Sequence, residues 1–217
     1  MKKVEPMSTY RESIETQIDS APTSLASYVA LVNKCASGRL NLQIANGSAE
    51  HARILIAKLF EFAESRVRII TGTLRQKTKS EGVEIYAHQP VIDQACAFIS
   101  KPNSRLEIIV QSGSLDGGED NALLNALSQH KARQGEVVVL VPKAGLLGEE
   151  VAHFMVADAS AYRIETGQDA KPSNRGIVAF ANFGDLKLSK SVSNYFEQVT
   201  RYIEADDRLA QRVIFNR

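Results

Sequence analysis

Two helix-like patterns open the chain. Apolar residues recur at spacings of three or four over residues 10–18 and again over residues 25–35. Ser8 precedes the first stretch, and Thr23 or Ser24 precedes the second. This spacing lines one face of a helix, and a hydroxyl residue before the first turn favours a helix start. We therefore expect two N-terminal helices, which either cover the main domain or form a surface for a partner.

From residue 39 onward, strand-like apolar runs alternate with helix-like stretches. The expected strands cover residues 39–44, 67–71, 83–86, 106–110, 137–141 and 176–180, with a hairpin of 153–156 and 162–165. The expected helices cover residues 49–65, 90–98, 120–131 and 189–202. A strand–helix–strand order favours parallel pairing with helices on both faces of the sheet. The pattern thus predicts an α/β fold, a mainly parallel mixed sheet flanked by helices, with an N-terminal helical extension.

The change of pattern sets the expected domain organisation. Residues 1–46 form the helical extension with a first strand, and residues 47–217 form the α/β domain. No apolar window reaches the roughly 18 residues of a membrane span, and the basic start lacks the apolar run of a signal peptide. We therefore expect a cytoplasmic protein without membrane contact.

Charge and cysteine content narrow the classes of partner. The 217 residues carry 26 Lys and Arg against 25 Asp and Glu, a formal charge of +1, so any anion-binding site must be local. Cys35 and Cys96 each lie in an apolar helical stretch and are expected to be reduced core residues. The four histidines fall in unrelated elements, so we expect no metal site.

Several catalytic motifs are missing from the sequence. There is no Gly-x-Gly-x-x-Gly or Gly-x-Ser-x-Gly, and the glycine pair Gly145 and Gly148 lacks the lysine of a phosphate-binding P-loop. These absences argue against a P-loop nucleotide hydrolase and a serine hydrolase. We expect no bound cofactor.

The order of elements itself carries a resemblance. A helix and strand over residues 51–71 are followed by a second pair over 90–110, then by a strand headed by His153, an Asp turn, another strand, and the segment 181–185 before a helix. Over residues 48–203 this order resembles the phospholipase D-like superfamily, which includes phosphodiesterases, nucleases and members that have lost activity. The resemblance implies that family's α/β fold.

The family motif is His-x-Lys-x-x-x-x-Asp. In the family the histidine attacks phosphorus, while the lysine and an asparagine hold the non-bridging oxygens. Here His153 matches the histidine and Asn182 the asparagine, but Met155 stands at the lysine position and Ser160 at the aspartate position, with Asp158 two residues early. The resemblance implies His153 and Asn182 as the catalytic candidates, and the departures imply a degenerate site.

A basic loop follows the expected strand at 67–71. Arg75, Lys77 and Lys79 alternate with small hydroxyl residues beyond the carboxyl end of that strand, where open α/β sheets bind ligands. They are our phosphate-binding candidates, with an ordinary solvated loop as the alternative. Arg163 and Glu165 share a face of their strand, which we interpret as an exposed ion pair that contributes little.

These features lead to three functional hypotheses. The first is a catalytically degenerate phospholipase D-like domain that acts as a binding or assembly module. Because the family builds its site from two halves and this chain holds one, we expect a homodimer. We also expect a protein partner at the N-terminal helices and a nucleic-acid or phosphate ligand. The second is a divergent phosphodiesterase or nuclease using His153 and Asn182, with Arg75 or Lys77 replacing the lysine. The third is a Rossmann-like nucleotide sensor.

Overall fold

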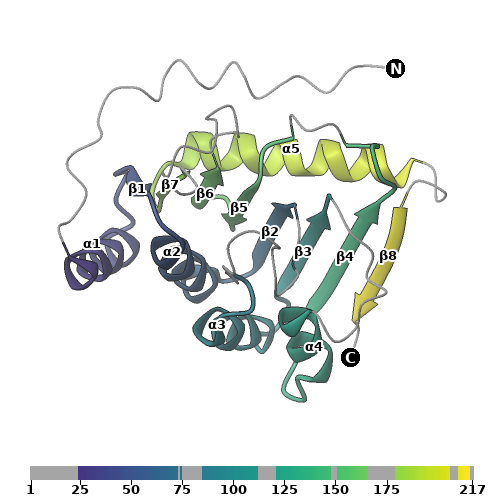
Figure 1. The fold of residues 1–217 in the computed structure, drawn as a ribbon, viewed down its shortest axis with the longest axis horizontal. Coiled ribbons are helices and arrows are strands. Elements are labelled where there is room, and N and C mark those ends of the chain that lie inside the picture. Colours follow the sequence, from purple (N-terminus) through teal and green to yellow (C-terminus); the bar gives the residue numbers. More distant parts are fainter. Residues whose placement is uncertain are drawn as a thin grey trace.

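One mixed sheet forms the centre of the molecule (Figure 1). The computed structural model describes residues 24–72, 74, 85–111, 121–147, 151–165, 179–205 and 210–215. The strands lie in the order β1-β7-β6-β5-β2-β3-β4-β8. Their bounds are β1 (Ile44–Asn46), β2 (Arg66–Thr71), β3 (Arg105–Val110), β4 (Glu136–Pro142), β5 (Phe154–Ala157), β6 (Ala161–Glu165), β7 (Ala179–Asn182) and β8 (Ala210–Phe215). The helices are α1 (Leu25–Ser37), α2 (Ala49–Phe62), α3 (Gln89–Ile99), α4 (Ala122–Gln129) and α5 (Leu186–Glu204).

The strand directions confirm a mixed α/β sheet but correct the expected parallel majority. Among the described strands, only β2–β3 and β3–β4 pair in parallel, and the other pairings are antiparallel. The β5–β6 hairpin enters beside β2, and β1, β7 and β8 extend the edges in antiparallel fashion. Apolar patterning marks a strand without naming its neighbour, which is why the sequence overstated parallel pairing. The topological support for a Rossmann-like sensor is thereby lost.

The helices form two layers around the sheet. Helices α1 to α4 lie on one face and α5 crosses the other, as Figure 1 shows. Alternate residues of each strand face opposite layers, so Ile69 and Met155 belong to the core under α1 to α4, whereas Ile70 and Phe154 belong to the core under α5. Every described polar residue of the central strands can therefore be assigned to a layer.

Helix α1 confirms the second N-terminal pattern with a rotated stripe. Ser24 caps its first turn by accepting a hydrogen bond from the backbone N–H of Ser27, and Tyr28 and Val32 are buried against the core. Leu25, however, is 45% exposed, so the expected inward face was shifted by part of a turn. The helix expected over residues 10–18 lies outside the described residues, and the division at residue 46 stays a prediction.

Three strand predictions need revision. Of the strand expected over 39–44, only Ile44 belongs to a strand, β1, and Arg39 has a left-handed φ of 47, which an extended strand does not allow. Of the strand expected over 83–86, residues 83 and 84 lie outside the described part, and Ile85 and Tyr86 form a turn before α3. Strand β8 was missed altogether. No helix among the described residues has both the length and the apolarity to cross a membrane.

Candidate functional site

The polar side chains of several strands meet at the edge where β2 and β3 end. Strand β5 runs antiparallel to β2, so His153, which precedes it, returns to this edge. Strand β6 ends there with Arg163 and Glu165, and β1 ends there with Asn46. Gln111 follows β3 at the same edge. Residues far apart in the chain, such as Asn46 and Arg163 with a separation of 117 positions, are thus brought into one cluster on the α2 side of the sheet.

Hydrogen bonds join the members of this cluster. His153 Nδ1 lies 3.1 Å from Glu165 Oε2, and His153 Nε2 contacts Gln111 Oε1. Arg163 donates from Nη1 to Glu165 Oε1 at 2.8 Å and from Nε to Asn46 Oδ1 at 3.2 Å. One carboxylate therefore holds the imidazole and the guanidinium in fixed positions.

A glycine makes room for the histidine. A Cβ atom on Gly72 would lie only 3.0 Å from Cε1 of His153, closer than a side chain normally allows. A larger residue would push the imidazole ring away from Glu165. Gly72 thus has a positioning role at the end of β2.

Burial makes the electrostatics of the cluster strong. Arg163 is 2% exposed, and its Nη2 has no hydrogen-bond partner among the described residues. Burial by itself would raise the pKa of Glu165, but the hydrogen bond with His153 and the charge of Arg163 lower it to about 2. Burial raises the pKa of Tyr28 and Tyr86, against the opposing effect of the Arg163 charge. The expectation of an exposed, weak Arg163–Glu165 pair was wrong, because helix α2 and the neighbouring strands cover it.

The register shows which residue lies beside the lysine position of the motif. Met155, at the lysine position, is fully buried. Its direct partner across the β5–β6 hairpin is Arg163, and cross-strand partners share a face of the sheet. A cation therefore stands beside the methionine, supplied by the next strand.

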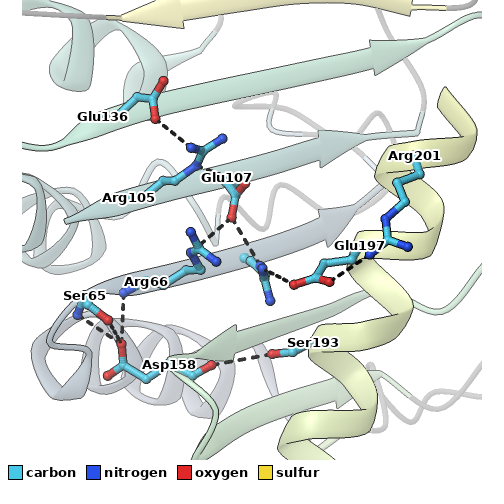
Figure 2. Close-up of polar contacts among 10 residues, drawn as sticks. Ser65, Arg66, Arg105, Glu107, Glu136, Asp158, Ser193, Glu197 and Arg201 are labelled. Carbon is cyan, nitrogen blue, oxygen red and sulfur yellow. Dashed lines mark hydrogen bonds and ion pairs between the residues drawn. The ribbon is translucent and has the colours of Figure 1, made fainter. Parts of the chain in front are cut away.

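Asp158 has a structural task. It occupies the hairpin turn with φ 51, a left-handed conformation that Asp tolerates better than most residues. Its carboxylate accepts hydrogen bonds from the backbone N–H groups of Glu64, Ser65 and Arg66 and from the Ser65 hydroxyl, at 2.9 to 3.0 Å. Figure 2 shows the contacts with Ser65 and Arg66. Burial would raise the pKa of Asp158, but these donors lower it. The carboxylate ties the hairpin to the start of β2.

Asn182 lies apart from His153. In the register, His153 stands in the row of Glu165, whereas Asn182 pairs with Tyr162, three rows further along and on the α5 face. Its Oδ1 accepts from the backbone N–H groups of Gly184 and Asp185 at 2.8 and 2.9 Å, which shapes the turn into α5. The two expected catalytic residues of one chain are therefore not brought together.

The remaining sequence candidates are only partly placed. Arg75, Lys77 and Lys79 lie outside the described residues, so their phosphate-binding role stays a prediction. Within the described ranges, no group of three or more His, Cys, Asp or Glu side chains is arranged to hold a metal ion. Cys35 is buried, Cys96 is half-buried, and both are free thiols. The sequence missed Arg163, Glu165, Asn46 and Gln111 as site residues.

Comparison with known proteins yields similarity in structure alone. No family model and no curated protein matches the chain. Among solved structures, the phospholipase D family member Nuc from Salmonella typhimurium is 11% identical with a TM-score of 0.51, over 79% of this chain and 97% of Nuc. NucT from Helicobacter pylori is 10% identical with a TM-score of 0.48, over 74% and 96%. TrmBL2, an archaeal chromatin protein, is 9% identical with a TM-score of 0.49, over 90% and 58%.

Proposed function

The chain has the phospholipase D-like fold, and we propose that it is a binding domain that holds a phosphate-bearing ligand around Arg163 without hydrolysing it. The observation that carries this proposal is the register of the hairpin. The lysine position holds the buried Met155, while Arg163 stands beside it with an unused N–H donor. A cation for binding is kept, and the arrangement for turnover is lost.

The histidine is poorly set up to attack phosphorus. Nδ1 of His153 contacts the Glu165 carboxylate, and Nε2 contacts the side-chain amide oxygen of Gln111, Oε1. Nε2, the nitrogen that would attack phosphorus, is thus already engaged by the side chain of Gln111. The family's lysine is also absent, and losing one such transition-state donor typically costs about 100- to 1000-fold in turnover. Both features favour binding over hydrolysis.

The guanidinium is well set up to hold an anion. Asn46 and Glu165 fix two of its edges, which leaves Nη2 as a buried donor. An unsatisfied buried donor costs about 1–3 kcal/mol, and a phosphate oxygen would remove that cost. Arginine is the side chain that binds phosphate with the most defined geometry. These features support a phosphate group as the ligand.

One observation favours a second candidate, a divergent phosphodiesterase or nuclease. Glu165 holds Nδ1 of His153, and a carboxylate in that position orients an imidazole for acid–base or nucleophilic work. If Gln111 turned away, Nε2 of His153 would be accessible, and Arg163 would supply the cation in place of Arg75 or Lys77. Because Asn182 of the same chain lies away from His153, a residue other than this one would have to take the place of the family's asparagine in such an enzyme.

We further propose that the domain works as a homodimer. The family assembles its site from two halves and this chain contributes one, so a second copy is the natural complement. Leu25 and Val29 on α1 are 45% and 36% exposed, and they form the described part of the expected N-terminal partner surface. A protein partner bound there, rather than a second copy, is the alternative.

The test uses the phosphodiester bis(p-nitrophenyl) phosphate with the full chain. We expect calorimetry to show saturable binding. We expect no hydrolysis that depends on His153, so any release of p-nitrophenolate should be the same in the wild type and in His153→Ala. Arg163→Gln should weaken binding at least tenfold and Arg163→Lys less, because lysine keeps the charge and loses the fork. Arg212→Gln, an exposed arginine of β8, is the matched control. Robust turnover lost in His153→Ala would establish the second candidate, and unchanged binding in folded Arg163→Gln would refute the proposed site.

A further inference from the structure

A polar groove lies on the other face of the sheet from His153. It has a volume of about 740 Å³ and runs between α5 and the starting ends of β2, β3 and β4. Arg66 and Arg68 come from β2, Arg105 from β3, and Lys190 from α5. Figure 2 shows the arginines on neighbouring strands with α5 beside them.

Three carboxylates bind the three arginines of this groove, but they are shared unevenly. Glu107, which is 14% exposed, faces three guanidiniums: Arg66 at 3.6 Å, Arg68 at 3.2 Å and Arg105 at 3.0 Å. Arg68 has a second carboxylate in Glu197 at 2.8 Å, and Arg105 has one in Glu136 at 3.0 Å. Arg66 has only the 3.6 Å contact among the described side chains, which is too long for a hydrogen bond.

Two of these arginines stand directly opposite each other. Arg66 and Arg105 are register partners on the parallel strands β2 and β3. Like charges on neighbouring strands repel each other, and Glu107 contacts both guanidiniums and so offsets that repulsion. Nε of Arg105 is buried and has no hydrogen bond of good geometry, although it lies 3.0 Å from Glu107 Oε1. Arg66 therefore retains N–H groups for an additional anion, and the guanidinium of Arg105, partly paired, lies on the neighbouring strand.

The opposite wall adds a third cation. Lys190 is exposed on α5, one turn before Asn194, and both line the groove. Asp158, in the turn of the β5–β6 hairpin, also lines the groove. Its carboxylate already accepts hydrogen bonds from backbone N–H groups at the start of β2. The groove is thus flanked by Arg66, Arg105 and Lys190, and its other two carboxylates, Glu136 and Glu197, are each paired with an arginine.

We propose that this groove binds the phosphoryl group of a small soluble phosphate ester, between Arg66, Arg105 and Lys190. A tetrahedral phosphate offers oxygens in several directions and can accept from cations on two strands and a helix at once. A carboxylate offers two oxygens and is satisfied by one guanidinium fork. Asn194 is a neutral donor beside the same space and suits the rest of a polar ester.

This groove is separate from the site around Arg163. The Arg163 cluster lies on the α2 face where β2 ends, and the groove lies on the α5 face where β2 begins. Binding at one place does not require the other. The proposal therefore stands whether or not the proposed function is correct.

The test titrates pyrophosphate into the full chain at low ionic strength and follows binding by calorimetry. Arg66→Gln combined with Lys190→Gln should weaken binding at least tenfold, because two of the three flanking cations are lost. Both residues are exposed, Arg66 by 43% of its side chain, so the fold is retained, as thermal unfolding will check. Arg201→Gln is the control, since the side chain of Arg201 is 77% exposed on α5 and does not line the groove. This variant should change the affinity for pyrophosphate less than twofold.

The same titrations distinguish the groove from the Arg163 site and from diffuse attraction by charge. Binding that Arg163→Gln removes, and that the double variant leaves intact, would overturn the groove proposal in favour of the Arg163 site. Equal weakening by Arg201→Gln and the double variant would also overturn it, since the attraction would then be spread over the surface. A single-stranded oligonucleotide that binds more tightly than pyrophosphate at equal phosphate concentration, and that the double variant releases, would overturn the small-ester assignment. Absence of saturable pyrophosphate binding up to millimolar concentration would refute the proposal outright.

Discussion

Removing the charge of Glu165 should cost the protein stability in a pH-dependent way. Glu165→Gln keeps the shape of the side chain but leaves the buried guanidinium of Arg163 without its counter-ion, and it weakens the partner of His153 Nδ1. Breaking a buried ion pair by removing one partner is strongly destabilising, because the remaining charge is uncompensated. The variant therefore tests whether the site is held together by this carboxylate.

The magnitude follows from the pKa of Glu165. Burial opposes ionisation, yet the contacts with His153 and Arg163 lower the pKa from 4.5 to about 2. A shift of that size corresponds to roughly 3 kcal/mol, and the 24% exposure of the side chain reduces this to about 2–3 kcal/mol. Because the folded pKa is depressed, the stabilisation is present above about pH 4.5 and is lost as the pH falls toward 2.

Urea unfolding of both proteins at pH 7 and pH 3 measures this effect. The free energy of unfolding of the variant should be lower by about 2–3 kcal/mol at pH 7, and the difference should shrink to about 1 kcal/mol at pH 3. Glu204→Gln removes an exposed partner of Arg212 and should change stability by less than about 0.5 kcal/mol. A difference below about 1 kcal/mol at pH 7, or one that does not change with pH, would refute the assigned role of Glu165.

Three further outcomes are expected. Asp158→Ala should lower the free energy of unfolding by about 2–4 kcal/mol, because three backbone N–H groups lose a charged acceptor; a loss within about 0.5 kcal/mol in urea unfolding would contradict this. Replacing Arg75, Lys77 and Lys79 by Gln should weaken nucleic-acid binding and reduce its salt slope by about one unit per lost phosphate contact, with the fold retained. Light scattering at micromolar concentration should report a dimer, and a clean monomer would argue against the two-half site.

The sequence predicted the parts of the fold that depend on local periodicity. The helix at residues 90–98 and the hairpin around Asp158 both appear, because apolar spacing and a turn residue suffice to specify them. Strand directions and partners depend on which elements meet in space, and the pattern contains no information on that point. Strand β8 was missed because it is a half-exposed edge strand whose apolar residues form no alternation long enough to stand out.

The candidate site was only partly predictable for the same reason. His153 was found because a family motif names it; the structure places it at the sheet edge, and its catalytic role stays a prediction. Arg163 and Glu165 were assigned to a solvent-exposed pair, since their own strand shows only that they share a face. Their burial comes from neighbours far away in the chain, and Asn46 is 117 positions from Arg163. No pattern within a single strand contains such a contact.

Met155 and Arg163 show why a linear motif understates what a site retains. Along β5, the lysine position has become apolar, and the motif predicts the loss of its cation. Across the hairpin, the next strand places a guanidinium beside that same position, on the same face of the sheet. A lysine at residue 155 would put a second buried cation next to Arg163, with Glu165 as their one nearby carboxylate among the described residues. The buried Arg163 therefore favours an apolar residue such as methionine at position 155. Since a guanidinium fixed by Asn46 and Glu165 cannot swing as a flexible lysine side chain does, Arg163 fits the proposed role in anion binding better than that of a mobile donor in turnover.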